Sequence, residues 1–195
     1  MWDLTGQNNI FAVASEDLGL SKKGLNFLGG IVAHASSMTA ITNPTVNSYK
    51  RINAPRTKSG ATWAPNTVTW TSNNRTHMVR VPAPGRFELR LPDGAANPYL
   101  LKAAIIAAGM DGISKESDPG EKSEVNMYEN REAITGAKKL PLNLLDALRE
   151  FDSNETFKEA IGLEFSKAFI KLKMEEWNSY VSHFSSWEKD HTLDV

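Results

Sequence analysis

Apolar residues near the start of the chain recur every three or four positions. They are Leu25, Leu28, Ile31, Val32, Ala35 and Met38. This spacing places them on one face of an α-helix, and Ser21 is available as its N-cap. We therefore predict a helix from Ser21 to about Ile41. Its Gly29-Gly30 pair costs about 1 kcal/mol of helix propensity per glycine, which indicates that another backbone or a ligand passes close by.

Residues 85–91 alternate between apolar and charged side chains, which is typical of a β-strand. Successive side chains of a strand point to opposite faces, so the segment has one apolar face and one charged face. The apolar face is Phe87, Leu89 and Leu91, and the charged face is Arg86, Glu88 and Arg90. Pro92, Asp93 and Gly94 then end the strand. The charged face is either an ordinary solvated surface or, in a suitable context, part of a binding site.

The middle of the chain predicts two more strands and a helix. Short alternating runs at 68–70 and 77–81 indicate strands. From Asn97 onward the apolar density rises to that of a helix covered on all sides. Residues 117–140 are charged and aperiodic, so we predict a surface connection and assign it no chemistry. A few strands backed by several helices indicate an α+β fold in one compact unit.

The last third of the chain predicts helices. Asn143 and Asp146 have capping-box spacing at the start of a helix over 142–151. A second helix begins near Ser153 or Asn154, and a longer one is expected over about 163–187. Aromatic residues recur along the longer helix: Phe165, Phe169, Trp177, Tyr180 and Phe184. Such a stripe indicates core packing or a subunit contact rather than a cofactor site.

Arginines gather in and around the predicted strands. Four of them fall within sixteen residues: Arg75, Arg80, Arg86 and Arg90. Arg51 ends a polar loop at 43–51 and offers a planar fork that matches a carboxylate or a phosphate, although an ordinary hydrogen-bonded loop is the alternative. Residues 52–66 form a long loop that is a candidate flap. His34 is interpreted as a packing residue of the first helix.

Composition limits the classes of function. The chain has 195 residues, 41% hydrophobic content, a net charge of -1 and no cysteine. A near-neutral chain has no global field to attract nucleic acid or an anionic membrane, so anion binding must be local. The absence of cysteine excludes disulfides and zinc–thiolate sites. The longest apolar run, 99–110, contains Lys102 and is too short to span a bilayer. We expect a cytoplasmic protein with no nucleic-acid or membrane partner.

Several long motifs resemble the glutamine synthetase family. They are NPTVNSYKR at 43–51, NNR at 73–75 and ELRLPDGAANPYLLKAAIIAAGMDGI at 88–113, and the resemblance covers essentially the whole chain. It implies the C-terminal portion of the family's catalytic domain, an α+β fold of antiparallel strands packed against helices. The stretches APRTKSGATWAP, NNRTHMVRVP and KLPLNLLDALREFD resemble the type III, or gamma-glutamylmethylamide synthetase-like, subgroup.

The resemblance implies an ATP-dependent ligase. The γ-carboxylate of glutamate is phosphorylated, and ammonia or methylamine then displaces phosphate to give an amide. Such chemistry needs positioning and charge neutralisation, which arginines and divalent ions supply. By resemblance, Arg51 and Arg90 bind the carboxylates of glutamate, and Glu88 is one ligand of Mg²⁺ or Mn²⁺.

The remaining arginines match the phosphate-binding positions of the family. By resemblance, Arg75, Arg80 and Arg86 face the transferred phosphate and the phosphates of ATP. Arg75 and Arg51 are the implied catalytic residues. The family forms rings, commonly dodecamers, so a homo-oligomer is expected of the full-length parent.

The flap departs from the family pattern. The family carries a glutamate there that shields the acyl phosphate and helps to deprotonate ammonium, whereas this chain has Trp63. An indole cannot accept a proton, although its face attracts a cation. Trp63 therefore favours an apolar-tipped amine such as methylamine without excluding ammonia.

The chain also lacks part of the family pattern. An N-terminal beta-grasp domain and most of the metal-ligating glutamates of the family lie upstream of the matching region. We therefore expect residues 1–195 to be a partial catalytic domain that does not catalyse alone, since one glutamate cannot hold two or three divalent ions against water. The alternative is a non-catalytic remnant or an interaction module that joins full-length oligomers. A phosphate- or nucleic-acid-binding module is a more distant alternative, weakened by the near-neutral charge.

Overall fold

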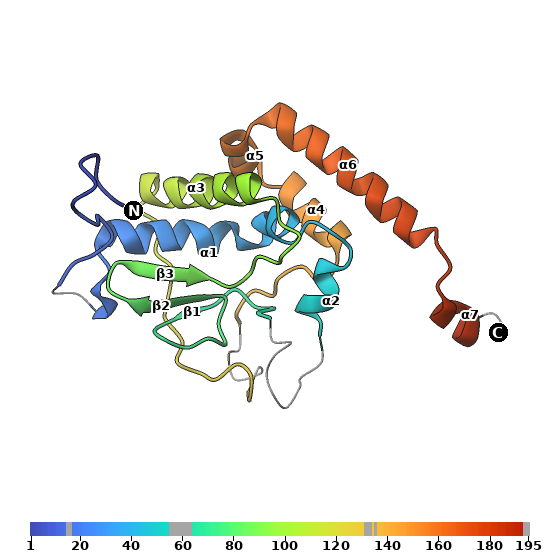
Figure 1. Ribbon diagram of the computed structural model, residues 1–195, viewed down its shortest axis with the longest axis horizontal. Helices are drawn as coiled ribbons and strands as arrows, with labels where there is room; N and C mark the ends of the chain where they lie inside the picture. Colours follow the sequence, from blue (N-terminus) through green and yellow to red (C-terminus); the bar gives the residue numbers. More distant parts are fainter. Residues whose placement is uncertain (15–16, 55–63, 131–133, 135, 193–195) are drawn as a thin grey trace.

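Helices stack in two layers on one face of a small sheet. The computed structural model describes residues 1–14, 17–54, 64–130, 134 and 136–192. Figure 1 shows the sheet, then helix α1 (Lys22–Thr42) over it, then helix α3 (Pro98–Ser114) over α1. Three helices follow at one end, α4 (Leu144–Asp152), α5 (Glu155–Ile161) and α6 (Leu163–Val181), and α6 leads away from the body to the C-terminal helix α7 (Ser186–Thr192). This arrangement confirms the α+β class.

The predicted first helix is confirmed, together with the reason for its glycines. Ser21 is the N-cap of α1, and its Oγ accepts a hydrogen bond of 3.1 Å from the Gly24 N–H. A Cβ at Gly30 would collide with the backbone of Ala108 and Gly112 on α3, and one at Gly29 would collide with the backbone of Ser117. Of the two predicted reasons for the glycine pair, a nearby backbone or a ligand, the structure shows the backbone. The two helices approach closely because neither carries a side chain at the crossing.

The sheet has three strands, β1 (Trp70–Thr71), β2 (Val79–Ala83) and β3 (Arg86–Leu89). β2 and β3 pair antiparallel, and the two-residue β1 pairs parallel to β2. Gly85 turns the chain between β2 and β3 at a φ of 66°, where a Cβ would also collide with Asn9 and Ala12. A short 3-10 helix, Asp17–Gly19, lies beside β2.

The predicted faces of β3 are confirmed. Phe87 packs against Phe11 and Phe27, with ring centroids 5.8 Å apart in each pair, and Leu91 is buried in the core. Arg86 and Glu88 occupy the other side of the strand. The apolar face is therefore held by the helical layer, and the charged face is free to form a site.

Helix α3 differs from the prediction. Asn97 caps it, and its Oδ1 accepts a hydrogen bond of 2.9 Å from the Tyr99 N–H. Ala104, Ala108 and the two glycines of the helix are buried against α1, but Tyr99 is exposed. The expectation of a helix covered on all sides is therefore wrong for the described residues, because Tyr99, Ile106 and Met110, on the side away from α1, are exposed.

The polar loop predicted at 43–51 contains a helical turn, α2 (Ser48–Ile52). Tyr49 and Ile52 are buried, and they anchor the turn to the core. Two apolar anchors in five residues are too few to reveal a helical period in the sequence.

The C-terminal helices are α4 (Leu144–Asp152), α5 (Glu155–Ile161), α6 (Leu163–Val181) and α7 (Ser186–Thr192). The start of α4 at Asn143 is confirmed as an N-cap, since the Asp146 N–H donates to Asn143 Oδ1 at 2.8 Å, and the two side chains are joined by a bond of 2.7 Å from Asn143 Nδ2 to Asp146 Oδ2. Gly162, at a φ of 108°, separates α5 from α6. None of the helices in the described residues is long and apolar enough to cross a membrane.

The single long helix predicted to Trp187 is wrong. The chain breaks after α6, and a new capping box starts α7: the Glu188 N–H donates to Ser185 Oγ at 3.2 Å, and the Ser185 N–H donates to Glu188 Oε2 at 2.7 Å. The Ser-x-x-Glu spacing is visible in the sequence and was missed. Phe169 is buried in the core and Phe165 and Trp177 pack against it, whereas Phe184 is exposed, so the end of the aromatic stripe is open to solvent.

Candidate active site

Glu88 lies at the centre of a cluster of arginines. Its Oε2 is 2.9 Å from Arg80 Nη2, and its Oε1 is 3.2 Å from Arg90 Nε. The hydrogen bond from Arg80 is the largest cause of a lowered pKa at Glu88, and the charges of Arg80, Arg90 and Arg75 lower it further. The carboxylate is therefore ionised and is held between two guanidinium groups.

Strand pairing sets this geometry. Arg80 on β2 is the cross-strand partner of Glu88 on β3, so the two side chains leave the sheet next to each other. Arg80 Nη1 also donates to Asn73 Oδ1 at 2.5 Å. The mostly buried Arg80 side chain is thus fixed from two sides.

Arg51 and Arg90 meet just beyond the end of β3. Arg90 N–H donates to Met78 O at 2.8 Å, which continues the strand ladder by one residue. Arg51 donates from Nη1 to Leu91 O at 3.1 Å and from Nη2 to Arg90 O at 3.3 Å. The structure therefore brings these two predicted carboxylate-binding residues together, with backbone carbonyls orienting the guanidinium of Arg51.

Positive charge is in excess and is partly desolvated. Burial is the largest cause of a lowered pKa at both Arg51 and Arg90. Arg90 Nη1 and Arg80 Nε are buried and have no hydrogen-bond partner within the described part of the chain. Buried donors without acceptors are costly, and Glu88, together with Asp93 acting on Arg51, does not balance this many guanidinium groups. The cluster is suited to an anionic ligand.

Arg75 and Arg86 lie at the edge of the cluster. Arg75 is exposed in the connection between β1 and β2, and its charge acts on Glu88. Arg86 is exposed at the start of β3, two residues before Glu88 and on the same side of the strand. Arg51, Arg75, Arg80 and Arg90 thus gather around Glu88 and the end of β3, whereas Arg86 shares only the side of the strand with Glu88. Trp63 lies outside the described residues.

The connection that carries Arg75 is held by hydrogen bonds to residues 123–127, which belong to the stretch 117–140 to which the sequence analysis assigned no chemistry. Val125 O accepts hydrogen bonds from Asn74 Nδ2 at 3.1 Å and from His77 Nε2 at 2.7 Å. Met127 N–H donates to Thr76 Oγ1 at 2.9 Å. His77 is fully buried, and burial is the main cause of its lowered pKa, so the neutral ring with a proton on Nε2 is favoured.

Further bonds join the same segment to β1. Glu124 Oε2 accepts from Ser72 Oγ at 2.8 Å, and Ser123 N–H donates to Trp70 O at 3.0 Å. These supporting residues were missed because bonds to backbone carbonyls leave no periodicity in a sequence. Only Asn74 and Thr76 gave a signal, since Asn-x-Thr is the pattern of an Asx turn, and Asn74 Oδ1 accepts from Thr76 N–H at 2.9 Å.

The described residues of this chain do not make a metal site by themselves. Among the described residues, no three histidine, aspartate or glutamate side chains gather closely enough to hold a metal ion. Glu88 is the one carboxylate in direct contact with the cluster among these residues, and two arginines already engage it. A divalent ion needs several oxygen ligands, so further ligands would have to come from elsewhere.

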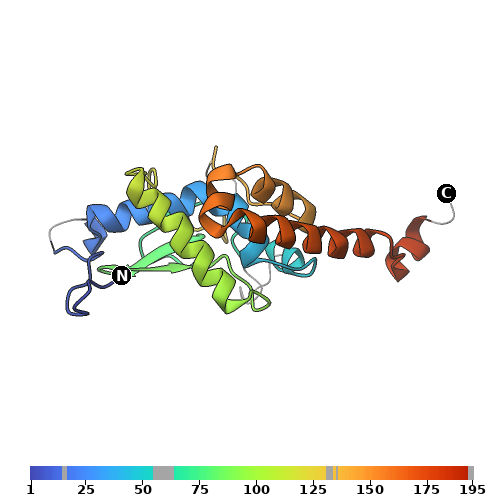
Figure 2. The ribbon, with the colours of Figure 1, turned by 90° about the horizontal axis from the view of Figure 1, so that it is seen from above.

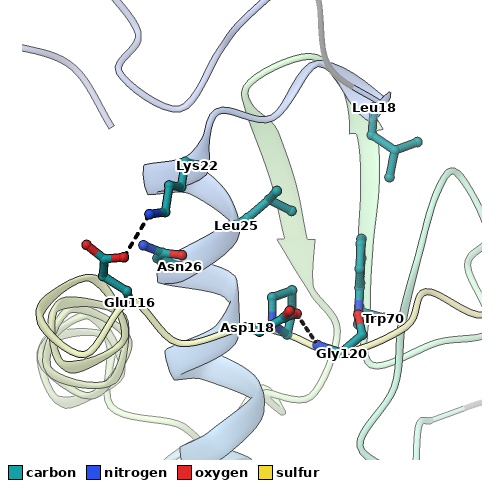
Figure 3. A pocket seen from close by; sticks show the side chains of 9 residues that line it. Leu18, Lys22, Leu25, Asn26, Trp70, Glu116, Asp118 and Gly120 are labelled. Carbon is teal, nitrogen blue, oxygen red and sulfur yellow. Dashed lines mark hydrogen bonds and ion pairs between the residues drawn. The ribbon is translucent and has the colours of Figure 1, made fainter.

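A cavity of about 400 Å³ lies apart from the arginine cluster, beside the start of α1. Figure 3 shows that its polar groups are engaged with one another: Lys22 pairs with Glu116 at 2.7 Å, and Asp118 accepts from the Gly120 N–H at 2.8 Å. Trp70 forms one wall, and its Nε1 donates to Gly120 O at 3.0 Å. The predicted site residues that are described do not line this cavity.

The packing role predicted for His34 is confirmed. Its Nε2 is 2.8 Å from Asp111 on α3, and its Nδ1 is 2.9 Å from Asn154 Nδ2 at the start of α5. Both ring nitrogens are occupied, so His34 joins three helices and is not a free ligand.

Comparison with known proteins identifies the family of the chain that carries the arginine cluster. The family described as "Glutamine synthetase, catalytic domain" matches residues 1–192. The chain belongs to the glutamine synthetase family. It is 64% identical over 195 residues to the glutamine synthetase of Rhizobium leguminosarum bv. phaseoli, covering 100% of this chain and 45% of that protein. It is 43% identical over 194 residues to the glutamate–methylamine ligase of Methyloversatilis universalis, covering 97% of this chain and 43% of that enzyme.

Solved structures agree with this glutamine synthetase assignment. "Apo GmaS without ligand" superposes on the whole chain with a TM-score of 0.90 and 49% identity, and "GmaS/ADP complex-Conformation 1" does so with a TM-score of 0.91 and 53% identity. The chain covers 43% and 44% of those two structures. It therefore spans less than half the length of the relatives it matches.

Proposed function

We propose that this chain is the substrate- and phosphate-binding part of an ATP-dependent ligase that joins glutamate to ammonia or methylamine. The main support is the excess of partly buried guanidinium groups around Glu88, which suits a ligand with several negative charges. Glutamate and ATP together bring two carboxylates and a triphosphate. The names of the relatives, glutamine synthetase and glutamate–methylamine ligase, support this substrate class.

The arginines divide between the two substrates. Arg51 and Arg90, which share the end of β3, bind the carboxylates of glutamate. Arg75, Arg80 and Arg86 neutralise the phosphates. A loose phosphoryl-transfer transition state carries its charge on oxygen atoms, so fixed cations stabilise it without covalent chemistry. Arg75 and Arg51 act nearest to the reacting groups.

The reaction has two balanced steps. An oxygen of the γ-carboxylate of glutamate attacks the γ-phosphorus of ATP, the bond to the bridging oxygen breaks, and ADP leaves with the electron pair. The amine then attacks the γ-carbon of the acyl phosphate, loses a proton and expels phosphate, which leaves the amide. The arginines of this chain hold the carboxylate and phosphate oxygens in line and offset their charge. One of the two similar GmaS structures is a complex with ADP, which supports the nucleotide assignment.

Mg²⁺ or Mn²⁺ is the expected companion of the phosphates. We propose that Glu88 supplies one carboxylate ligand, while the remaining ligands belong to the part of the glutamine synthetase fold that this chain does not contain. Bound there, the ion would withdraw charge from phosphate oxygen. This division of ligands is the reason that we expect the isolated chain to be inactive.

Trp63 bears on the choice of amine. It replaces the acidic residue of the usual flap and offers an apolar indole in place of a base. We propose methylamine as the preferred nucleophile, with ammonia as an alternative substrate. We also propose a homo-oligomer for the full-length enzyme, as the family resemblance implies.

Phosphate release tests the proposed function. A chimera would join the unmatched upstream part of the Rhizobium leguminosarum glutamine synthetase to residues 1–195. We expect phosphate release that depends on ATP, glutamate and Mg²⁺ from the chimera and none from the chain alone. Replacement of Trp63 by Glu should shift the preference from methylamine towards ammonium.

A conservative variant of the chimera, Arg51→Lys, tests the glutamate site. It keeps the positive charge but loses the planar guanidinium that donates to two backbone carbonyls. It should raise the KM for glutamate about 10-fold or more. A folded chimera without activity, or Arg51→Lys with an unchanged KM, would contradict the proposal.

A further inference from the structure

Helix α3 carries an apolar stripe on its outer side. The stripe consists of Tyr99, Ala103, Ile106 and Met110, which we call the outer stripe. Tyr99 is 81% exposed, Ile106 54% and Met110 47%. The spacing of four, three and four residues places them along one line of the helix, which is the seam that an approaching helix contacts.

The opposite side of α3 is already used. Ala104, Ala108, Gly109 and Gly112 face α1 and are buried, and the Gly112 backbone packs against Gly30. The helix is therefore apolar on both sides, but Tyr99, Ile106 and Met110 of the outer side are exposed to solvent. A helix that is apolar all round belongs to the interior of a protein. The outer stripe has the composition of a core face and not of an ordinary surface.

A groove runs beside the stripe. It has a volume of about 640 Å³ and is lined by Ala103, Ile106, Ala107 and Met110, by Asp111 and Ser114 at its polar end, and by Ala160 of α5. Most of these side chains are small, and the two large ones, Ile106 and Met110, are about half exposed. In Figure 2, which views the molecule from above, α3 lies on the near side with α1 and the sheet behind it. The shape suits the ridge of a helix.

We propose that the outer stripe and its groove are the docking surface for the portion of the glutamine synthetase fold that this chain does not contain. The chain aligns over its full length at 64% identity but covers 45% of that relative, and it covers 43% and 44% of the two GmaS structures. More than half of each relative is thus additional polypeptide. In those relatives the additional part is linked covalently, so its effective concentration at the stripe exceeds that of a free partner.

The proposal rests on family membership and on the exposed stripe, not on the proposed chemistry. A second copy of this chain is the rival occupant, because a line of apolar residues can also pair with itself. The two occupants make different predictions for the accessibility of the stripe, since only self-pairing depends on the concentration of the isolated chain.

The absence of cysteine from the chain allows a direct test. A single cysteine would be introduced as Ile106→Cys, both in the isolated chain and in the chimera, and its rate of maleimide labelling would be measured. Leu172→Cys is the matched control, because Leu172 is an apolar residue of α6 that is 61% exposed. The chimera without an added cysteine gives the background.

We expect Ile106→Cys to react rapidly in the isolated chain, at a rate independent of protein concentration, and at least 10-fold more slowly in the monomeric fraction of the folded chimera. Leu172→Cys should react at the same rate in both proteins. Hydrogen exchange of residues 99–114 in unmodified proteins should show the same protection in the chimera. Circular dichroism checks that each variant is folded.

Equal labelling of Ile106→Cys in both folded proteins would overturn the proposal. So would labelling of the isolated chain that slows as its concentration rises, or protection confined to an oligomeric fraction of the chimera, since either would assign the stripe to another copy. Phosphate release is read separately. A protected stripe in an inactive chimera would support the docking surface and count against the proposed function, and activity with an unprotected stripe would do the reverse.

Discussion

Glu88 on β3 lies opposite Arg80 on β2, and their side chains form an ion pair of 2.9 Å. The pair is a direct result of antiparallel register, because cross-strand neighbours on one face are within reach of each other. Arg90 then contacts the other carboxylate oxygen at 3.2 Å. One carboxylate thus orients two arginines of the proposed substrate site.

Replacing this carboxylate with an amide tests its structural role. Glu88→Gln keeps the size but leaves Arg80 and Arg90 without a counter-charge, so we expect the free energy of unfolding to fall by about 1 kcal/mol at pH 7. The value is at the low end for ion pairs because the Glu88 side chain is 35% exposed to solvent. Urea unfolding measures the change, and Glu164→Gln on the exposed start of α6 is the control.

The same pair predicts a pH dependence. The pKa of Glu88 is lowered in the folded chain, so its contribution is complete above the unfolded value near 4.5 and disappears as the pH falls towards the folded value. The difference between the wild type and Glu88→Gln should shrink on acidification below pH 4.5. A difference that grows on acidification would mean that Glu88 is not held as an anion.

His77 predicts a second pH effect, at milder acidity. Burial lowers its pKa below the usual 6.5, so folding favours the neutral ring, and stability is lost as the pH falls from 6.5 towards the folded value. His77→Gln should unfold with a smaller change in urea midpoint between pH 7.5 and pH 5.5 than the wild type. His183→Gln, at an exposed position, should behave as the wild type does. If the urea midpoint of His77→Gln changed with pH as much as that of the wild type, His77 would not be the group whose protonation destabilises the fold.

The tie between Asn74 and Val125 predicts an effect on catalysis without direct contact with substrate. Asn74→Ala removes the bond from Nδ2 to Val125 O and also the Asx turn next to Arg75. In the chimera we expect kcat to fall about 10- to 100-fold through misplacement of Arg75, with a smaller change in KM for glutamate. Asn154→Ala is the control, since it removes a similar pair of bonds at the start of α5, from Nδ2 to Ser37 Oγ and from the Phe157 N–H to Oδ1. An equal loss of kcat in both variants would show that the bond from Asn74 to Val125 affects only the general stability of the fold.

The crossing of α1 and α3 predicts a strong effect of one methyl group. Gly30→Ala would drive a Cβ into the backbone of Ala108 and Gly112, so we expect a loss of about 1–3 kcal/mol in the free energy of unfolding. Gly94→Ala is the control, since a Cβ there meets no atom within 4 Å among the described residues. Thermal or urea unfolding compares the two. A stable Gly30→Ala variant would show that the helices can separate at little cost.

Local patterns were sufficient for much of the fold. Three local features could be predicted from the sequence: the helical period of α1, its N-cap Ser21 and the N-cap of α4 at Asn143. Each depends on residues three or four positions apart. The two faces of β3 were also predicted, since strand alternation is a local property. The break before α7 had a local signal as well, the Ser-x-x-Glu spacing at Ser185, which was missed.

The sequence by itself determined most of the elements, the family and the identity of the arginines in the candidate site. The tertiary structure decided which groups meet: the pairing of Arg80 with Glu88, the support of the Arg75 connection by Val125, and the open side of α3. These contacts join residues distant along the chain, often through backbone carbonyls that every residue carries. Sequence patterns report local periodicity, and burial and long-range hydrogen bonds follow only from how the elements pack.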